Sequence, residues 1–332
     1  MMEIASMNTE NPLVSVVIPS LNRAHYLVPT IESVLSQDYH PIECIVVDGG
    51  STDGTVEILR QYVNRIKWVS EPDKGHADAV NKGWHMSRGD ILAWLNADDL
   101  YVVPKAVSKM VAYLQRNQQV DVVYGDYTEI SEDGEVVSDV IKPREWDLAS
   151  AVKYCHYTIP QATSFMRRSI LEKVGWLDAE FGNGKDHELW LRIGMVGTIE
   201  YAPFHIARIR NCPGLSQRLD MGQAKVRVTE KFFCQPDLPA PFNSGQFKRR
   251  AMSNSYLVGG MYIWVGTRQL RPTLQYLVRA LVADPLNCPY ILKQLLSRFA
   301  RSVFSLLPLQ WRRRIKQVAQ RTGLSLSRSS SH

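Results

Sequence analysis

The segment ILAWLNADDLY, residues 91–101, opens with five apolar residues and then becomes polar at Asn96. The apolar run has the length and composition of a strand that is buried on both faces of a parallel sheet. Two adjacent acids, Asp98 and Asp99, follow, although neighbouring negative charges repel each other. Such an end suits either a surface turn or a site that holds a cation, and the rest of the chain decides between the two.

Three β-rich runs precede this segment, and runs with helical apolar spacing separate and follow them. The expected strands are residues 14–20, 44–47, 66–70 and 90–95, and the expected helices are residues 24–37, 55–63, 74–87 and 103–117. This alternation implies a parallel sheet with crossover helices on both faces. Asp53 is expected to cap the second helix, and the Asp133-Gly134 turn signals a hairpin. The sequence therefore predicts an α/β fold with a mixed, mostly parallel sheet flanked by helices.

Polar loops follow the expected strands at the edge where open α/β sheets bind their ligands. These loops are residues 19–23, 48–53, 71–75 and 96–99. Neither a GxGxxG dinucleotide fingerprint nor a GxxxxGK[ST] phosphate loop is present. Phosphates would need another partner, and a divalent cation, Mn or Mg, held by Asp98 or Asp99 is the natural candidate.

Five sequence blocks resemble, in order and spacing, the family 2 glycosyltransferases. The blocks are VSVVIPSLNR, VVDGGSTDGT, SEPDKGHADAVNKG, GDILAWLNADD and PQATSFMRRSILEKVGWLDAEFGNGKDHELWLRIG. The resemblance covers residues 14–216 and implies the GT-A fold. It also implies an inverting transfer from a nucleotide-diphosphate sugar to an acceptor hydroxyl, in the assembly of cell-surface polysaccharide or glycolipid.

The resemblance further implies roles for single residues. Asp48 would lie at the nucleoside, Asp98 would be the metal acid of a DxD-type signature, and Asp99 a second metal ligand. Asp186 matches the catalytic base, and a carboxylate within reach of the acceptor hydroxyl can take its proton. The other donor-binding positions are Pro19, Asn22, Arg23, Asp78, Lys82, Asn96 and Ala97.

Three positions depart from the family pattern. Gly49 stands where many relatives carry a second acid, which leaves the identity of the base open. Asn96 replaces the first acid of the metal signature, and Cys212 replaces a histidine that can complete the metal or phosphate site. His205 or His187 could substitute for that histidine, or it is not needed.

Three other functions stay open. A non-catalytic relative would bind a nucleotide sugar without turnover. A nucleotidyltransferase shares the nucleotide-binding half-sheet, but it usually needs a Gly-rich basic loop after the first strand, and SLNRAHY is not such a loop. A nucleic-acid-binding module would explain the pI of about 9.0, but the basic residues lie on helices without an aromatic β-platform, so no nucleic-acid partner is expected.

Composition favours a reducing, cytoplasmic location. The five cysteines form no CxxC pair, the N-terminus lacks an apolar signal core, and no run approaches the roughly 18 apolar residues of a membrane span. The formal net charge of +6 makes an acidic partner worth considering.

The C-terminal part is expected to be helical and basic. Residues 246–285 resemble the tetratricopeptide-like helix pair that follows many bacterial members of the family. Residues 298–314 form a basic amphipathic segment that either lies on an anionic membrane surface or packs on the catalytic domain. Peripheral attachment to the inner face of the cell membrane would suit a lipid-linked acceptor.

The expected domains are a flexible N-terminus (1–12), the GT-A domain (13–220), a helical extension (221–322) and a disordered tail (323–332). Acceptor choice would depend on the loops at residues 146–161 and 181–185.

Overall fold

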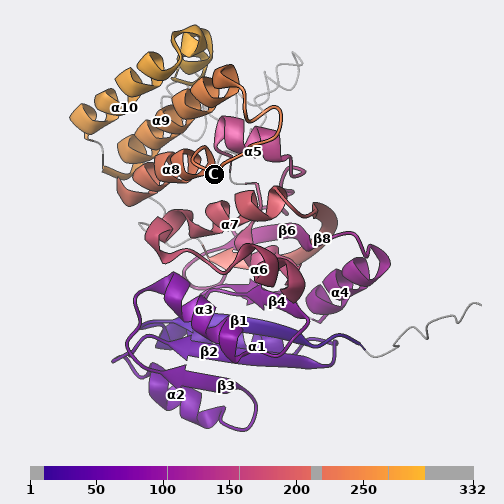
Figure 1. The fold of residues 1–332 in the computed structure, drawn as a ribbon. Coiled ribbons are helices and arrows are strands. Elements are labelled where there is room, and N and C mark those ends of the chain that lie inside the picture. The colour runs from indigo at the N-terminus through magenta and orange to yellow at the C-terminus, as the bar shows by residue number, and fades with distance from the viewer. Residues whose placement is uncertain (1–10, 103, 157, 211–218, 268, 296–332) are drawn as a thin grey trace, which may run out of the picture.

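A computed structural model describes residues 11–102, 104–156, 158–210, 219–267 and 269–295 (Figure 1). These residues form an eight-stranded sheet in the order β3-β2-β1-β4-β7-β6-β8-β5. The strands are β1 (Val14–Ser20), β2 (Ile42–Asp48), β3 (Lys67–Ser70), β4 (Ile91–Trp94), β5 (Leu100–Tyr101), β6 (Val122–Ile130), β7 (Phe165–Arg167) and β8 (Ile199–Arg210). Strands β1 to β4 pair in parallel, β7 is antiparallel to both neighbours, and β6 and β8 are parallel. The predicted fold class, a mixed α/β sheet, is confirmed.

The expected hairpin around the Asp133-Gly134 turn forms only in part. β6 meets the returning chain at two isolated bridges, Tyr127 to Ile141 and Ile130 to Val136. Its longer ladder is instead with β8, and Val122 and Val123 pair with β7. β6 thus pairs mainly with strands distant in sequence, which a local turn signal cannot reveal.

Helices cover both faces of the sheet, as the sequence predicts (Figure 1). In the first 210 residues they are α1 (Ala24–Leu35), α2 (Thr55–Gln61), α3 (His76–Met86), α4 (Ala106–Arg116), α5 (Leu148–Tyr154), α6 (Arg168–Val174) and α7 (Lys185–Gly194), with the 3₁₀ turns η1 (Gln161–Thr163) and η2 (Ala179–Gly184). The N-cap of α2 is Gly54, at φ +93°, rather than Asp53. The Asp53 carboxylate instead accepts hydrogen bonds from the N–H groups of Ala24 (3.0 Å) and Thr55 (3.2 Å), so it joins the first turns of two helices.

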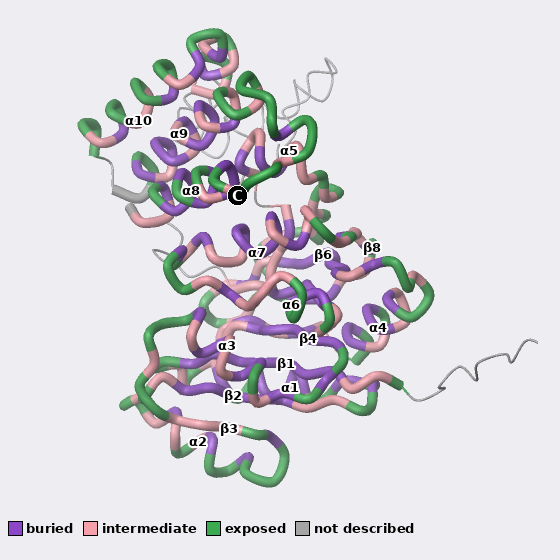
Figure 2. The backbone as a smooth tube through the Cα atoms, viewed as in Figure 1, coloured by how far each residue is buried: buried purple, intermediate pink, exposed green. Residues whose placement is uncertain are grey.

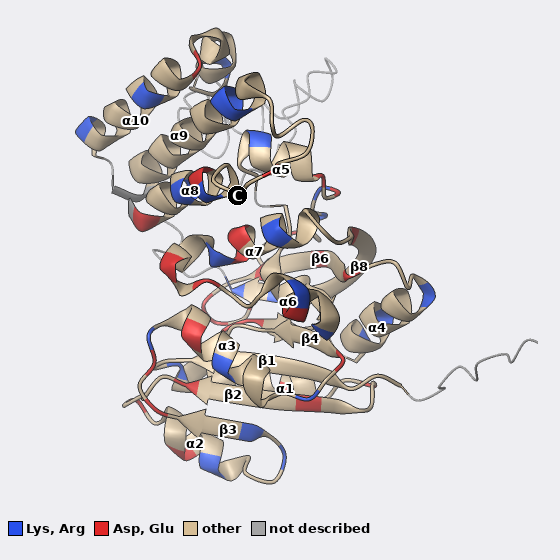
Figure 3. Cartoon of the chain, viewed as in Figure 1, with Lys and Arg blue, Asp and Glu red and all other residues tan. Residues whose placement is uncertain are grey.

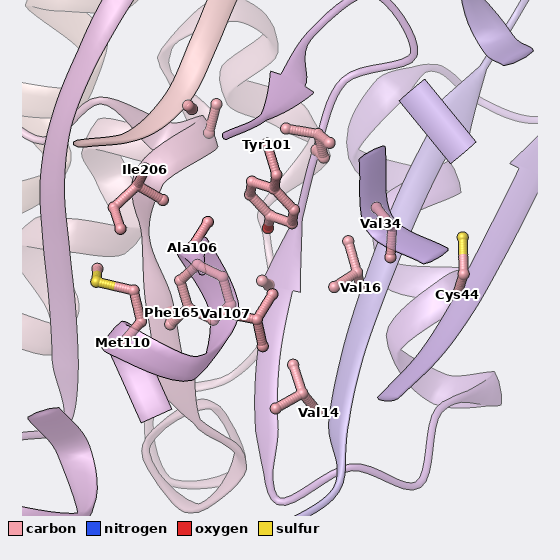
Figure 4. Packing of buried hydrophobic residues seen from close by; sticks show 14 of the residues in the cluster. Val14, Val16, Val34, Cys44, Tyr101, Ala106, Val107, Met110, Phe165 and Ile206 are labelled. Carbon is pink, nitrogen blue, oxygen red and sulfur yellow. The ribbon is translucent and has the colours of Figure 1, made fainter. Parts of the chain in front are cut away.

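The alternating side chains of the strands divide the core into two clusters. In β1, Val14, Val16 and Ile18 pack against α1 and α4, whereas Val17 faces α3 on the other side. Figure 4 shows part of the first cluster, in which the Tyr101 and Phe165 rings stack 5.6 Å apart. The buried centre of the sheet stands out in Figure 2.

Three further helices form the extension: α8 (Leu219–Phe232), α9 (Gly245–Thr267) and α10 (Leu270–Ala283), followed by the 3₁₀ turn η3 (Pro285–Asn287). α9 and α10 pack side by side, and helices therefore stand where the helix pair is expected. A Cβ added to Gly222 would lie 2.5 Å from the Gly259 carbonyl oxygen, so α8 and α9 approach closely because both positions lack a side chain. Among the described helices, none combines the length and the apolar character needed to cross a membrane.

Candidate functional site

The loop after β2 is built around Asp48, which is fully buried. Its carboxylate accepts hydrogen bonds from the N–H groups of Gly50 (3.2 Å) and Ser51 (2.9 Å) and from the hydroxyls of Ser51 and Ser70 (2.7 Å for Ser70). A carboxylate with this many donors fixes the backbone around it. Asp48 therefore shapes the loop and ties it to the end of β3.

The loop after β1 locks onto the same loop. Asn22 has a left-handed backbone (φ 52°); its N–H donates to Ser51 Oγ (2.7 Å), and its Oδ1 accepts from the Thr52 N–H (2.9 Å). Pro19 is buried in β1 opposite Val47. The donor-binding candidates on β1 and β2 thus form one rigid unit at the carboxyl edge of the sheet.

The Asp73 carboxylate fills the space beside Gly49. A Cβ at position 49 would lie 2.6 Å from Asp73 Oδ2, so a side chain there would displace this carboxylate. Asp73 also accepts a hydrogen bond from the Gly75 N–H (2.8 Å). Asp73, in the loop after β3, therefore places a carboxylate beside Gly49, where the sequence has no second acid after Asp48. Motif spacing alone could not show this contact.

Asn96 links two elements of the site through an oriented amide. His76 Nε2, at the start of α3, lies 2.9 Å from Asn96 Oδ1 and must be the donor, because the amide oxygen only accepts. The Asn96 Nδ2 in turn donates to Asp99 Oδ2 (3.0 Å). The amide oxygen of Asn96 is thereby engaged by a histidine.

Asp99 is buried, and both of its oxygens have protein donors. Oδ2 receives the Asn96 amide, and Oδ1 receives the Arg210 N–H (2.9 Å). Burial and the neighbouring Asp98 charge raise the pKa of Asp99 to about 7. Asp99 therefore anchors the loop from inside.

Arg210, at the end of β8, holds the same loop from outside. Its Nε donates to the Asp98 carbonyl (2.9 Å), its Nη1 donates to the carbonyls of Ser131 (2.7 Å) and Glu132 (2.6 Å), and its guanidinium stacks over Tyr26. The sequence does not predict this contact of Arg210, because no local pattern joins positions 98 and 210.

Asp98 is the acid that the loop leaves available. Its carboxylate lies 3.8 Å from Arg23 Nε, and its side chain keeps 15% of its surface exposed. Ala97, just before it, is buried, and the Ala97 carbonyl lies 3.0 Å from the Thr30 hydroxyl. Within the described ranges, no three His, Cys, Asp or Glu side chains gather as a metal cluster.

Asp78 and Lys82 lie on α3, beside the other loops. Asp78 accepts a hydrogen bond from the Lys74 N–H (3.0 Å), and Lys82 forms an ion pair with Glu71 (2.8 Å). The Glu71 carboxylate raises the pKa of Lys82. Both side chains are thus tied to the loop after β3 rather than to Asn96 or Asp98.

A stack of tryptophans places Asp186 near these loops. Trp94 of β4 packs edge-on against Trp84 of α3 (5.2 Å) and stacks on Trp190 of α7 (5.9 Å). Asp186 lies one turn before Trp190, in the first turn of α7, and its Oδ1 accepts the His187 N–H (2.9 Å). α3, β4 and α7 are therefore held together where their site residues begin.

His76 in α3 and Lys185 in α7 belong to the elements that meet at this junction. Desolvation and the Lys185 ammonium lower the pKa of His76, although the residue as a whole is exposed. Desolvation also lowers the pKa of Lys185, an effect that the adjacent Asp186 carboxylate opposes. The contacts thus run from Asp48 through Asn22, Arg23, Asp98 and Asn96 to His76 on α3, and the tryptophan stack joins α3 to α7.

Behind Asp186 lies a buried polar cluster that joins α7 to the extension. Lys225 of α8 is 1% exposed, and its Nζ lies 3.4 Å from the Cys155 carbonyl and 5.4 Å from the Tyr262 ring centroid. Burial lowers the pKa of Lys225 to about 7, while the interactions with Cys155 and Asp186 act in the opposite direction. Burial and the Lys225 charge lower the pKa of His187. No sequence pattern marks this lysine as a core residue.

An ion network beside this cluster supports the segment before α7. Glu188, which is buried, pairs with Arg192 (2.8 Å) and Lys231 (2.8 Å), and Lys231 also pairs with Asp178 (2.7 Å). Arg192 also donates to the carbonyl of Trp176 (2.7 Å). The network connects α8 to the chain that leads into η2 and Asp186.

The histidines considered as substitutes for Cys212 lie elsewhere. His205 Nε2 is 3.2 Å from Thr128 Oγ1, between β6 and β8, and His187 is buried in α7. Cys212 itself, and the basic segment 298–314, fall outside the described residues.

Comparisons with known proteins identify proteins whose sequences are similar to this chain. A family model described as "Glycosyl transferase family 2" matches residues 15–175. An uncharacterized glycosyltransferase of Mycobacterium tuberculosis is 34% identical over 191 residues, which cover 57% of this chain and 71% of the relative. One from Rickettsia typhi is 31% identical over 199 residues, covering 58% of this chain and 62% of the relative. Escherichia coli chondroitin synthase is 27% identical over 193 residues, 57% of this chain but 28% of the synthase.

Two solved structures share the fold. Staphylococcus aureus TarS 1–349 in complex with UDP-GlcNAc superposes with a TM-score of 0.60 at 16% identity, covering 81% of this chain and 79% of that one. A mannosyltransferase from Pyrobaculum calidifontis, in complex with GDP-Man and Mn²⁺, gives 0.59 at 20% identity, covering 89% and 81%. The match to the Rickettsia typhi relative leaves more than a third of that protein's length unmatched.

Proposed function

Because this chain belongs to glycosyl transferase family 2, we propose that it transfers a sugar from a nucleotide-diphosphate sugar to an acceptor hydroxyl with inversion at the anomeric carbon. The observation that carries the proposal is the set of contacts that joins the loops of Asp48, Asn22 and Asp98 at one edge of the sheet, while the Trp94 and Trp190 stack holds α7, the helix of Asp186, against β4. TarS and the mannosyltransferase, which share the GT-A fold, were solved with UDP-GlcNAc and GDP-Man respectively, which supports the donor class.

The donor nucleoside is proposed to bind at the rigid unit made by the loops after β1, β2 and β3. Asp48 shapes that unit, and the Asp73 carboxylate beside Gly49 offers an acceptor for a base N–H. Asn22 and Arg23 lie on the path from this unit to Asp98, so they suit the ribose and the diphosphate. Pro19, Asp78, Lys82, Asn96 and Ala97 complete the proposed donor site.

A divalent cation, Mn or Mg, fits at Asp98. Such cations are often held by one or two carboxylates together with substrate phosphates and water, so an all-protein cluster is not required. Asp98 offers the partly exposed carboxylate, and Asp99, held by Asn96 and Arg210, is the second candidate ligand and the anchor of the loop. When bound, the cation would neutralise negative charge on the leaving diphosphate.

Asp186 is proposed as the general base. It accepts the proton of the acceptor hydroxyl while that oxygen attacks the anomeric carbon, and the bonding pair between sugar and nucleotide leaves with the diphosphate. One displacement from the face opposite the leaving group inverts the configuration. The position of Asp186 in the first turn of α7, fixed by the Trp94 and Trp190 stack, supports this role.

The acceptor is proposed to belong to cell-surface polysaccharide or glycolipid assembly at the inner face of the cell membrane. The likeness to chondroitin synthase supports a polysaccharide product, and the free cysteines among the described residues suit a reducing compartment. Residues 13–220 would form the catalytic domain, and residues 221–322 the extension that packs beside Asp186.

The experiment is a thermal-shift screen of nucleoside diphosphates and their sugars with Mn or Mg, followed by a transfer assay. We expect at least one nucleotide to stabilise the protein, and Asp186→Asn to keep this stabilisation while losing at least about a hundredfold in transfer. Asp38→Asn, at an exposed acid, is the matched control and should transfer normally. Stabilisation by no nucleotide would refute the proposal; nucleotide binding without any turnover would favour the non-catalytic alternative.

A further inference from the structure

The outer face of α10 is apolar and exposed. Leu270, Leu274, Val278, Leu281 and Val282 follow helical spacing, and their exposed fractions run from 37% to 75%. The opposite face buries Thr273 and Ala280 against α9. Figure 2 shows the exposed side of α10 at the edge of the molecule. A stripe of this kind marks an interaction surface rather than a scatter of single surface residues.

The charged residues on α10 and in the chain around it are almost all basic. Residues 238–332 contain 15 of the 39 Lys and Arg but only one of the 33 acids, Asp284. The first 237 residues hold 24 basic and 32 acidic side chains, so the two parts of the chain carry opposite net charges. On α10 itself, Arg271 and Arg279 are exposed beside the stripe, and Figure 3 shows basic positions without acids along this helix.

We propose that the outer face of α10 docks onto an anionic lipid surface. The five apolar side chains would insert at the boundary of head groups and acyl chains, while Arg271 and Arg279 pair with lipid phosphates. A nucleic acid would leave the apolar stripe unused. A second copy of the same face, and the chain after residue 295, are themselves basic and offer no complementary charge.

This surface lies in residues other than the basic segment 298–314, and it goes beyond the transfer reaction. α8 contacts both η2 and α7, so the extension is joined to the side of the domain that carries Asp186. A lipid surface under α10 would therefore reach the protein through the extension and not through the nucleotide-binding loops (Figure 1).

The test is co-sedimentation of the full chain with vesicles. We expect binding to vesicles containing phosphatidylglycerol, weaker binding to phosphatidylcholine alone, and loss on raising the salt concentration. The triple variant Leu274→Gln, Val278→Gln and Val282→Gln should bind at least about tenfold more weakly, because three inserted side chains are lost. A matched triple variant at exposed valines of the catalytic half, Val63→Gln, Val136→Gln and Val137→Gln, should bind as the parent does.

Several results overturn the proposal. The proposal is wrong if the parent protein does not sediment with anionic vesicles, or if the parent and the α10 variant bind equally well. Light scattering that shows a parent dimer and a monomeric α10 variant would assign the face to a second copy. A lower unfolding temperature of the α10 variant, without vesicle binding by the parent, would mean that the chain's own C-terminal part covers the stripe. A Tm equal to that of the parent confirms that any loss of binding is local.

Discussion

Replacing the buried Lys225 by methionine should change how the stability of the protein depends on pH. Lys225→Met keeps an unbranched side chain, one heavy atom shorter, and removes its charge. The groups around Lys225 are Cys155 and His156 at the end of α5, Asp186 and His187 on α7, and Tyr262 on α9. Burial raises the pKa of the Cys155 thiol and lowers the pKa of both histidines, so these groups stay neutral from pH 7 to 9.

The sign follows from proton binding in the two states. Lys225 has a pKa of about 7 in the folded protein, against 10.5 in an unfolded chain. Between these values the unfolded chain holds a proton that the folded protein does not, so stability rises with pH. The cost of burying the ammonium is greatest below pH 7 and disappears towards pH 10.5. One such group changes the free energy of unfolding by at most about 1.4 kcal/mol per pH unit. Between pH 7 and 9 the free energy of unfolding of the parent should therefore rise by up to about 2–3 kcal/mol relative to that of the variant.

The assay is urea unfolding at pH 7, 8 and 9, followed by tryptophan fluorescence. The free energy of unfolding of the parent should rise relative to that of Lys225→Met as the pH rises from 7 to 9. Lys105→Met, at an exposed lysine, should show a constant difference. A Lys225→Met curve parallel to the parent curve over this range would refute the reasoning.

Three other substitutions test the loops and the sheet. A Cβ on Gly125 would lie 2.5 Å from the Phe204 carbonyl oxygen, so Gly125→Ala should lower the free energy of unfolding by about 1–3 kcal/mol in urea; no change would mean that β8 yields easily. Asp48→Ala leaves the loop N–H groups without their acceptor and should cost about 2–4 kcal/mol in the same assay, whereas a value below 1 kcal/mol would show that water replaces the carboxylate. Arg210→Met should weaken nucleotide binding in Mn at least about tenfold by calorimetry, with unchanged circular dichroism, because the Asp98 loop loses its outer support; unaltered affinity would contradict this.

Local sequence patterns were sufficient for most elements of the sheet. The runs at β1, β2 and β4 are continuous and apolar because both faces of these strands are covered, and the helices between them show the apolar spacing of one buried face. Parallel strands end at one edge, so the order of the polar loops also predicted which candidate residues would meet. The proximity of Asn22, Asp48 and Asp98 follows from this geometry.

The less predictable features depend on residues that are distant in sequence. Asp53 bonds to Ala24 as well as to its own helix, Asp73 fills the space beside Gly49, and Arg210 supports the loop of Asp98. Each of these contacts joins two loops or strand ends from different parts of the chain. No periodicity or turn signal contains that information.

The sequence by itself determined the alternation of strands and helices over the first 117 residues and the residue types that gather at one edge of the sheet, since apolar periodicity marks the elements and parallel strands end at the same edge. Only the tertiary structure decided the state of each group at that edge. Asp99 is buried and anchored, whereas Asp98 is partly exposed, although the two are adjacent and chemically identical. The physical reason is packing: β8 brings the Arg210 N–H to Asp99, and His76 of α3 orients the Asn96 amide that donates to Asp99, so the packing of β8 and α3 fixes which carboxylate loses its water.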